Sequence, residues 1–466
     1  MTGLEFKNYY ETEAFKRECI DLETEWGSYY TKQGTTFRVW ATMAEGVNVC
    51  IYSNGTDLEE GARQIGVYPM TAGTQDGKKA TYECYVEGNL EGCYYTYQVM
   101  REGQTFECPD PYAKSAGANG QRSMIIDLAN TNPAGWEKDA NWKQKNPHTA
   151  IYELHVKDFS YQVASGVSAA HRGKFMAFTE DCKATKHLVD LGISHVHFLP
   201  MYDYGSVDET GSDDQFNWGY DPGNYNVPEG SYSTNAYDGR VRVKEAKQMV
   251  QALHNRGIGV VMDVVYNHTS PDSVLTEEHP EFFYRKPDGN MGNRVGDWTD
   301  VVDLDYNCKE LWDYQIDSLK FWAGIVDGFR CDVASFVPVE FWCRAREAVE
   351  QVRPGCIWLA ETVHGGFGQF ARKSGMYSAN DYDMFQAFDM EYEYDVREVF
   401  DRYLNGETNL SNYVDVINFQ ECAYPANYIK MRCLENHDQP RICSFVKDRL
   451  SLTNYTAFLY FLKGTT

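Results

Sequence analysis

Short apolar runs alternate with amphipathic segments of helix length from Ile151 to the end of the chain. Each run is too short for a helix and is bounded by polar residues, as is typical of strands buried in a parallel sheet. The runs are Ile151–Val156, His195–Leu199, Ile258–Val265, Val326–Val333, Ile357–Ala360, Phe385–Met390 and Ile429–Leu434. Repeated βα units of this length predict an α/β fold with a parallel sheet, and this many of them predict a TIM (β/α)8 barrel.

Helical periodicity marks the segments between these runs. Five apolar residues recur three and four positions apart, which puts them on one helix face: Val243, Ala246, Met249, Val250 and Leu253. Gly257 follows past the end of this segment, where helices commonly stop. Trp312, Ile316 and Leu319 form a second such face.

The first part of the chain has a β pattern instead. Alternating or β-branched runs lie at Thr36–Ala41, Val47–Tyr52, Thr81–Val86 and Tyr94–Met100. Short strands joined by turns predict a β-sandwich. Asn132–Trp136 and the Asn146–Pro147 pair read as a linker. We therefore place a sandwich domain with its linker at residues 1–145 and a barrel domain at residues 146–466.

Composition and charge limit the partners of this protein. Hydrophobic residues make up 43% and charged residues 24%, as in ordinary globular proteins. The net charge of −25 argues against nucleic acid or an anionic membrane as a partner. The first residues lack an apolar signal region and no run approaches membrane-spanning length. The thirteen cysteines show no Cys-x-x-Cys pair, which favours free thiols in a reducing, cytoplasmic compartment; secretion stays open if the chain is a processed fragment.

The run Val326–Val333 carries the most informative polar residues. Side chains alternate along a strand, so Arg330 and Asp332 share a face while Cys331 points the other way. The C-terminal end of a barrel strand is where catalytic groups lie, and a neighbouring guanidinium favours an ionised carboxylate. The pattern therefore fits a nucleophile, but taken alone it fits a structural Arg–Asp pair equally well.

Three other strand ends carry polar residues in the same way: Asp263–His268, Ala360–Thr362 and Glu435–Asp438. With Arg330–Asp332, these segments stand in the order of the four short sequence regions of glycoside hydrolase family 13, the α-amylase family. The chain from Ile151 onward resembles that family. Membership would imply a retaining glycoside hydrolase that acts on α-glucans.

The resemblance implies a role for each polar residue. Asp332 would be the nucleophile, Glu361 the general acid/base and Asp438 the third carboxylate, with His268, Arg330 and His437 lining the same subsite. Retaining cleavage requires two carboxyl groups about 5–5.5 Å apart, one ionised and one protonated. Because Glu361 would face an anion and a drier wall, we expect its pKa to be raised.

A long loop rich in Gly, Asp and Ser follows the second barrel strand and contains Phe216–Pro222. By the same resemblance Tyr220 is the stacking platform under the cleaved sugar, with Trp218 and Asp221 as neighbouring substrate-binding residues. The alternative is a loop packed by its own aromatic side chains.

Different segments of the sequence indicate different bond specificities. The loop from Phe216 to Tyr237 resembles type I pullulanases, which cut α-1,6 branches. Thr362–Val363 and Asn436–Arg441 instead resemble α-1,4-acting amylases and α-glucosidases, and Cys331 departs from the usual pullulanase Phe. Because these departures affect the catalytic strands, we expect α-1,4 hydrolysis of starch, glycogen or derived oligosaccharides. The alternatives are α-1,6 debranching, transglycosylation and a non-catalytic carbohydrate-binding relative.

Three further expectations rest on resemblance. Gly34–Tyr52 resembles the immunoglobulin-like carbohydrate-binding module family 48, which either binds glucan or serves only as a packing partner. Asn267 occupies a position that ligates calcium in many amylases, and Asp303 lies in a related stretch, so Ca²⁺ is a candidate ligand and no other cofactor is required. Gly464–Thr466 would open the eighth barrel strand, which predicts a barrel truncated before that strand, with unpaired edges on strands seven and one.

Overall fold

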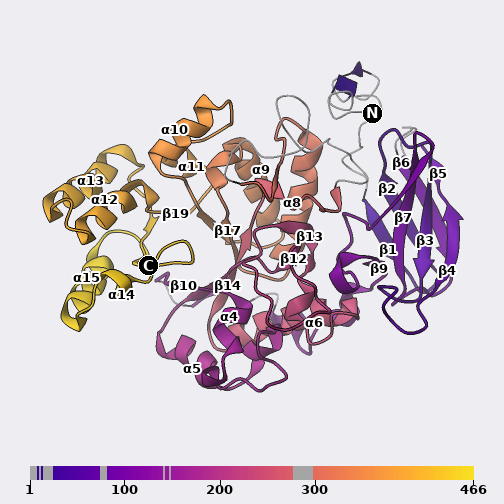
Figure 1. Cartoon of the computed structure of the whole chain (residues 1–466), viewed down its shortest axis with the longest axis horizontal. Helices are drawn as coiled ribbons and strands as arrows, with labels where there is room; N and C mark the ends of the chain where they lie inside the picture. Colours follow the sequence, from indigo (N-terminus) through magenta and orange to yellow (C-terminus); the bar gives the residue numbers. More distant parts are fainter. Residues whose placement is uncertain are drawn as a thin grey trace.

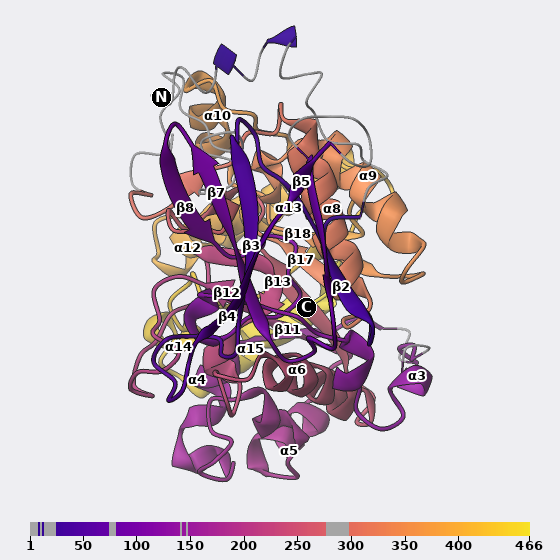
Figure 2. The ribbon, with the colours of Figure 1, turned by 90° about the vertical axis from the view of Figure 1, so that its right-hand side faces the viewer.

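The computed structural model describes residues 8–9, 12–13, 25–73, 81–139, 142–145, 148–275 and 298–466. The linker pair Asn146–Pro147 lies outside these ranges. An N-terminal β-sandwich stands beside an α/β unit built on a parallel sheet (Figure 1). Viewed from the sandwich side, the strands of the sandwich lie in front of the α/β unit (Figure 2).

The sandwich consists of two antiparallel sheets. The first has the order β1 (Gly27–Tyr30), β2 (Gly34–Trp40), β6 (Thr81–Glu87), β5 (Thr71–Ala72). The second has the order β4 (Gln64–Pro69), β3 (Gly46–Tyr52), β7 (Tyr94–Arg101), β8 (Gln104–Cys108), and β9 (Ser123–Met124) also pairs with β7. Alternate residues such as Phe37, Val49 and Tyr97 fill a shared core, as strand alternation requires. The four strands predicted in this part of the chain are confirmed.

The α/β unit is organised around one seven-stranded sheet in which every pairing is parallel. In spatial order its strands are β10 (Ile151–Leu154), β11 (His195–Phe198), β14 (Gly259–Val264), β17 (Gly328–Cys331), β18 (Ile357–Ala360), β19 (Met390–Tyr392) and β20 (Lys430–Met431). Spatial order equals chain order, as in a barrel wound by successive βα units.

One predicted strand was wrong in position. The run Phe385–Met390 mostly precedes β19: Asp381–Met384 form the short helix α11 and Phe385 follows it as the C-cap. Phe388 packs against Trp342 and Trp358 in the layer outside the sheet. A short apolar run has the same composition in either layer, so periodicity could not assign it.

Helices and short ladders surround the sheet. The helices are α3 (Trp136–Asp139), α4 (Val156–Tyr161), α5 (Lys183–Asp190), α6 (Gly239–His254), α8 (Lys309–Ala323), α9 (Val339–Glu350), α10 (Gly365–Lys373), α11, α12 (Tyr394–Leu404), α13 (Leu410–Ala423), α14 (Ile442–Phe445) and α15 (Arg449–Phe461). The two-stranded ladders are β12 (Tyr202–Tyr204) with β13 (Pro222–Pro228), and β15 (His268–Thr269) with β16 (Val302–Asp303). The helix face predicted at Val243–Leu253 is buried along α6, and Asp238 caps its first turn. No helix of the described ranges is both long and apolar enough to cross a membrane.

The last residues of the chain lie between the seventh and first strands. Thr465 N donates to Lys430 O at 2.9 Å and Thr465 O accepts from Arg432 N at 2.8 Å, which forms a parallel bridge beside β20. Ile151 N, at the start of β10, donates to Thr466 O at 2.7 Å. The expectation of two unpaired edges was therefore wrong at this level of the sheet, because residues 465–466 continue the hydrogen bonding across the seam.

Candidate active site

Asp332 and Glu361 stand at the carboxyl ends of two paired strands. The β17–β18 register sets Cys331 opposite Ala360, so the residues that follow them are neighbours. The Arg330 guanidinium lies 2.9 Å from Asp332 Oδ1 through Nη1 and 2.9 Å from Glu361 Oε2 through Nη2. One fully buried cation thus holds the two carboxyl groups side by side.

The second oxygen of Asp332 is held from the neighbouring strand. Asn267 Nδ2 donates to Asp332 Oδ2 at 2.9 Å, while Asn267 Oδ1 lies 2.6 Å from His268 Nδ1. His268 Nε2 lies 2.7 Å from the backbone oxygen of Tyr220, which belongs to the long loop predicted at the site. The rotamer of Asp332 is therefore fixed on both sides, as a nucleophile requires.

Glu361 is placed to hold a proton. Burial raises its pKa well above the ordinary value; Arg330 opposes this shift, and the negative charges of Asp332 and Asp438 add to it. The backbone N–H of Val333 donates to Glu361 Oε2 at 2.9 Å. Val333 adopts φ 39°, ψ 43°, a left-handed conformation that β-branched residues rarely take. This strained residue, directly after Asp332, directs its N–H at the second acid.

Asp438 lies in the loop that follows β20. Its backbone N–H donates to Asn436 Oδ1, and His437 Nε2 lies 3.4 Å from its carboxylate. Burial raises the pKa of Asp438, although the charges of His437 and Arg330 oppose the shift. The side chain keeps 42% exposure, so it can contact a ligand in the cavity.

Below these acids, ionic side chains from successive strands form a chain across the barrel interior. Glu153 from β10 lies 3.5 Å from His197 Nδ1 of β11, and His197 Nε2 lies 3.2 Å from Asp263 Oδ2 of β14. Asp263 Oδ1 lies 2.9 Å from Arg330 Nη1 of β17. Burial opposes charging of His197, but Asp263 and Glu153 raise its pKa. Opposite charges therefore alternate from strand to strand beneath the site.

Glu153 and His197 were not predicted as site residues. Both sit inside short apolar runs, and their side chains are 13% and 0% exposed, so each charged group needs a partner. That local signal was present in the sequence, but the sequence does not say which strands become neighbours.

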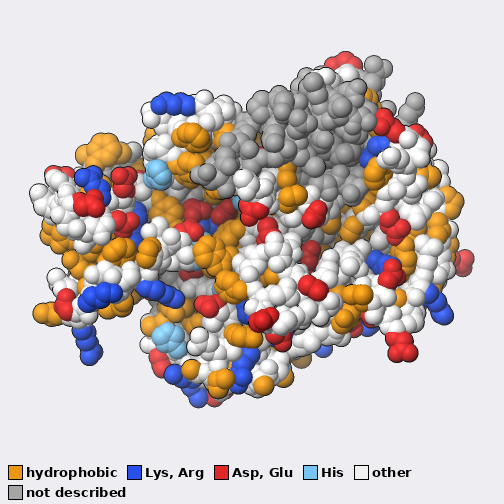
Figure 3. All heavy atoms as spheres, viewed as in Figure 1, with side chains coloured by type: hydrophobic (Ala, Val, Ile, Leu, Met, Phe, Trp, Pro, Cys, Tyr) orange, Lys and Arg blue, Asp and Glu red, His pale blue; other side chains and the backbone are white. Residues whose placement is uncertain are grey.

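A cavity of about 890 Å³ opens above the acids. The predicted residues that line it are Trp218, Tyr220, His268, Asp332, Glu361, His437 and Asp438. The Tyr220 ring stacks on His437 at 5.2 Å, and its hydroxyl donates to Asp263 Oδ2 at 2.8 Å. Figure 3 shows acidic side chains at the bottom of a hollow beside the lobe of α12 and α13. Arg330 and Asn267 lie beneath this cavity and act on it through Asp332.

Asp221 does not line this cavity, and its role in substrate binding stays a prediction. Its Oδ2 accepts from Ser206 N and Oγ, and its Oδ1 accepts from Asn217 Nδ2. The carboxylate therefore shapes the loop that presents Trp218 and Tyr220.

Among the residues that the structure describes, those around Asn267 do not form an oxygen cage for calcium. Both polar atoms of the Asn267 side chain already contact Asp332 and His268. Among the described residues, the small cavity it shares with Asp303 is otherwise lined by Leu304, Tyr306, Phe336, Met376 and Tyr377. Ca²⁺ takes six to eight oxygen ligands. Calcium at Asn267 stays a prediction that this geometry does not favour.

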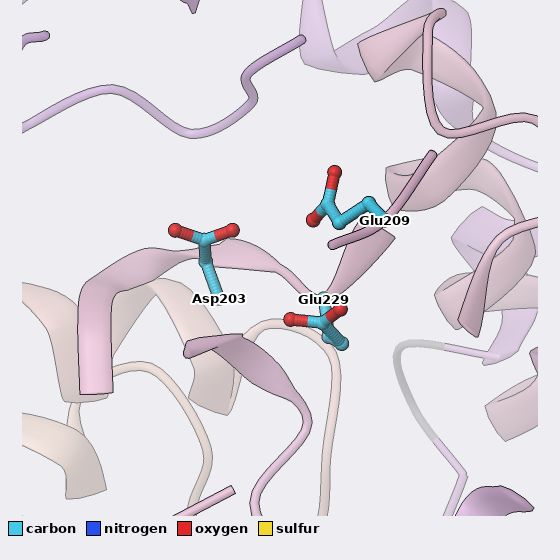
Figure 4. A group of neighbouring side chains, drawn as sticks. All are labelled: Asp203, Glu209 and Glu229. Atoms are coloured by element: carbon cyan, nitrogen blue, oxygen red, sulfur yellow. The ribbon is translucent and has the colours of Figure 1, made fainter. Parts of the chain in front are cut away.

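One group of acidic side chains within the described ranges is close enough to share a cation. Ligand oxygens of Asp203, Glu209 and Glu229 lie within 4.8 Å of one another (Figure 4). The guanidinium of Arg242 is already among them, 2.7 Å from Glu209 Oε2 and 3.8 Å from Asp203 Oδ1. Glu209 also accepts from the backbone N–H of Asn119 at 2.7 Å. The cluster therefore joins the segment between β8 and β9 of the sandwich to the loop of the active site.

The amino-acid sequence matches a known catalytic domain over most of this unit. The family described as alpha amylase, catalytic domain, matches residues 182–290 and 295–466, which is more than half of the chain. The chain belongs to the α-amylase family. The family described as carbohydrate-binding module 48 (isoamylase N-terminal domain) matches residues 24–113, within the sandwich.

Several pullulanases are similar in sequence to this member of the α-amylase family. Chloroplastic pullulanase 1 of Arabidopsis thaliana is 31% identical over 392 residues, which cover 72% of this chain and 39% of that protein. Pullulanase of Bacillus subtilis is 28% identical over 376 residues, which cover 77% of this chain and 49% of that protein. The chain thus spans about two fifths to one half of the length of these relatives.

Solved structures agree with these relatives. Pullulanase from Bacillus acidopullulyticus superposes with a TM-score of 0.76 at 30% identity, covering 90% of this chain and 52% of that chain. Pullulanase from Paenibacillus barengoltzii in complex with maltohexaose and alpha-cyclodextrin gives a TM-score of 0.69 at 32% identity, covering 77% of this chain and 56% of that chain.

Proposed function

We propose that this protein is a retaining glycoside hydrolase that cleaves α-1,6 branch bonds in α-glucans. The observation that carries the chemistry is the Arg330 guanidinium, 2.9 Å from both Asp332 and Glu361 at the base of a cavity. It brings one carboxylate and one proton-holding carboxyl group together, which is the pair that retaining cleavage requires.

In the first step, Glu361 gives its proton to the glycosidic oxygen. The bond between that oxygen and the anomeric carbon breaks, and the leaving chain departs as an alcohol. Asp332 forms a bond to the anomeric carbon from the opposite face. Burial, together with the charges of Asp332 and Asp438, raises the pKa of Glu361, so the proton is available near neutral pH.

In the second step, the same groups exchange roles. Glu361, now a carboxylate, takes a proton from water, and the water oxygen bonds to the anomeric carbon as the Asp332 ester breaks. The product keeps the α-configuration. Tyr220 would stack under the reacting ring, while His268, His437 and Asp438 would bind its hydroxyl groups more tightly as the ring flattens.

The relatives favour α-1,6 over α-1,4 cleavage. Both curated relatives and both solved structures described above are pullulanases, whereas the α-1,4 specificity expected from the catalytic strands has no comparable support. One observation still favours α-1,4 cleavage as a second candidate. Thr362, Val363 and Gln439, which belong to the segments that resemble α-1,4-acting enzymes, line the cavity.

Product analysis on pullulan, amylose and panose separates these candidates. Cleavage of α-1,6 bonds releases maltotriose from pullulan and leaves amylose intact, whereas α-1,4 cleavage degrades amylose. Longer oligosaccharides built from panose would indicate transglycosylation. If the folded protein formed no product from any of these substrates, the proposal would be wrong. A carbohydrate-binding function would then remain.

Two variants test the roles of the acids. Asp332→Asn and Glu361→Gln should each lower hydrolysis by about 10³-fold or more without unfolding the protein, because each removes one of the two reacting groups. Circular dichroism checks the fold. Near-native turnover by either folded variant would overturn its assignment, and NMR detection of the β-anomer first would overturn retention.

A further inference from the structure

Asp438 sits in a loop that has little support from its own strand. The strand before it, β20, consists only of Lys430 and Met431 and pairs with β19 through those two residues. Asp438 lies well beyond the end of this strand, and its side chain is partly exposed. Packing around the carboxylate therefore does not fix the third acid, so its position depends on contacts made by the rest of the loop.

The first turn of α12 holds the start of this loop. Arg397 Nη1 donates to Cys433 O at 3.0 Å, and Arg397 Nη2 donates to Leu434 O at 3.1 Å. Arg397 is buried, and its Nε donates to Asp401 Oδ1 at 2.9 Å. Because a guanidinium is planar, three occupied nitrogens leave it little freedom to rotate. The helix and the start of the loop are therefore rigidly joined.

Asn436 connects the same turn of α12 to Asp438. Its Nδ2 donates to Tyr394 Oη at 2.6 Å, and its Oδ1 accepts from the backbone N–H of Asp438 at 3.1 Å. Asn436 does not line the cavity, so its amide acts on a ligand only through Asp438. The Tyr394 hydroxyl thus holds the amide whose oxygen fixes the backbone of the third acid.

Tyr394 is itself fixed against the neighbouring strand. Its ring stacks on that of Tyr392 of β19, with the centroids 5.3 Å apart. The Tyr392 hydroxyl donates to Glu153 Oε2 at 3.3 Å, and Glu153 Oε1 accepts from the backbone N–H of His437 at 2.8 Å. His437 directly precedes Asp438. The contacts therefore form a closed ring that supports the third acid from β10 on one side and from β19 and α12 on the other.

We propose that Tyr394 is a positioning residue for Asp438 and acts through the Asn436 amide. This inference rests on the proposed function, since it assigns a support to the third acid of that reaction. Tyr394 also lines the cavity, but Asn436 already binds its hydroxyl. Support of Asp438 and direct contact with a sugar predict different kinetics, because a supporting residue has no effect once Asp438 has lost its carboxylate.

Tyr394→Phe tests this support, because it removes Oη and keeps the ring on Tyr392. We expect kcat on pullulan to fall about 10–100-fold, as for a displacement of about 1 Å, with KM changed by less than about twofold. The loss appears in kcat because Asp438 binds the sugar more tightly in the transition state than in the ground state. Asn436→Ala should cause a similar loss, and the two changes together should cost no more than either alone.

A double-mutant cycle with Asp438→Asn separates support from direct contact. In the residual activity of Asp438→Asn, adding Tyr394→Phe should alter kcat by less than about twofold, as expected for residues that act as a unit. A further loss as large as that in the unmodified protein would show that Tyr394 acts independently of Asp438, and would overturn the proposal.

α11 offers a matched control. Asn380 Nδ2 donates to Tyr382 Oη at 3.2 Å, which is the same kind of bond on an exposed tyrosine outside the cavity. Tyr382→Phe should leave both kcat and KM unchanged. A loss equal to that of Tyr394→Phe would mean that removal of any such hydroxyl disturbs the protein, and would overturn the specific role of Tyr394.

Hydrogen exchange tests the same contacts without turnover. Because Asn436 accepts from the N–H of Asp438, Tyr394→Phe should speed exchange of a peptide covering Asn436–Asp438 about fivefold, as expected for one lost hydrogen bond. Peptides covering Gly328–Cys331 should keep their protection. Unchanged exchange at Asn436–Asp438 would overturn the proposal. Absence of hydrolysis by the unmodified protein, with the exchange difference present, would count against the proposed function alone, so the two failures are distinguishable.

Discussion

Glu153 contacts both the backbone N–H and the imidazole ring of His437. Glu153 Oε1 accepts from His437 N at 2.8 Å and lies 2.9 Å from His437 Nδ1. The two residues are 284 positions apart and meet across the seam between β10 and the loop after β20. Asp438 is the next residue, so this contact sets the position of the third acid.

We expect Glu153→Gln to lower kcat/KM on pullulan by about 10–100-fold. The amide keeps one oxygen but loses the charge that faces His437 and His197, so the loop of Asp438 becomes looser, and displacement by about 1 Å costs about this much. Steady-state kinetics and a thermal melt measure both effects. Glu137→Gln, an exposed change on α3, is the control. An unchanged kcat/KM would show that the seam contact does not position the acid.

The pH profile of kcat/KM should have a basic limb that is set by the pKa of Glu361. Its raised pKa keeps the proton needed for the first step, and kcat/KM falls as the pH rises through that pKa. Because the charge of Asp438 contributes to this shift, Asp438→Asn should move the basic limb to lower pH in the residual activity. If the basic limb did not move, the charge of Asp438 would not contribute to the pKa of Glu361.

The acidic cluster should make stability depend on pH. Burial, with the negative charge of Glu209, raises the pKa of Glu229 to about 8. Between its ordinary pKa and about 8, the unfolded chain releases a proton that the folded protein keeps, so the free energy of unfolding decreases as the pH rises. Glu229→Gln removes this contribution and should reduce the fall in Tm between about pH 5 and 8. Glu347→Gln, exposed on α9, should show the slope of the unmodified protein.

Hydrogen exchange should reveal a weaker seam. β17 pairs over four residues with a neighbour on each side, whereas β20 pairs over two residues with β19 and through one bridge with Thr465. Amides of Lys430 and Met431 should therefore exchange much faster than those of Gly328–Cys331. Mass spectrometry of exchanged peptides measures this. Equal protection would mean that residues 465–466 close the ring as firmly as a full strand.

Local pattern was enough to predict most elements, whereas the roles of the three acids were inferred from the resemblance of four strand-end segments to the α-amylase family. Strand alternation and helix periodicity are properties of neighbouring residues, so Ile357–Ala360 and the buried face of α6 followed from the sequence. The proximity of Asp332 and Glu361 follows because the carboxyl ends of parallel strands meet at one edge of a sheet. The run Phe385–Met390 failed because the sheet and the helix layer bury the same kinds of side chain.

Contacts between distant residues depend on the assembled barrel. Nothing within Ile151–Leu154 indicates that Glu153 will bind His437, and nothing near Asp221 indicates that its carboxylate turns into its own loop. The bridging of β20 and β10 by Thr465 and Thr466 depends on the curvature of the whole sheet. Local pattern determines which side chains are buried or carry charge, but only the closing of the sheet selects their partners, because those partners come from strands far apart in the chain.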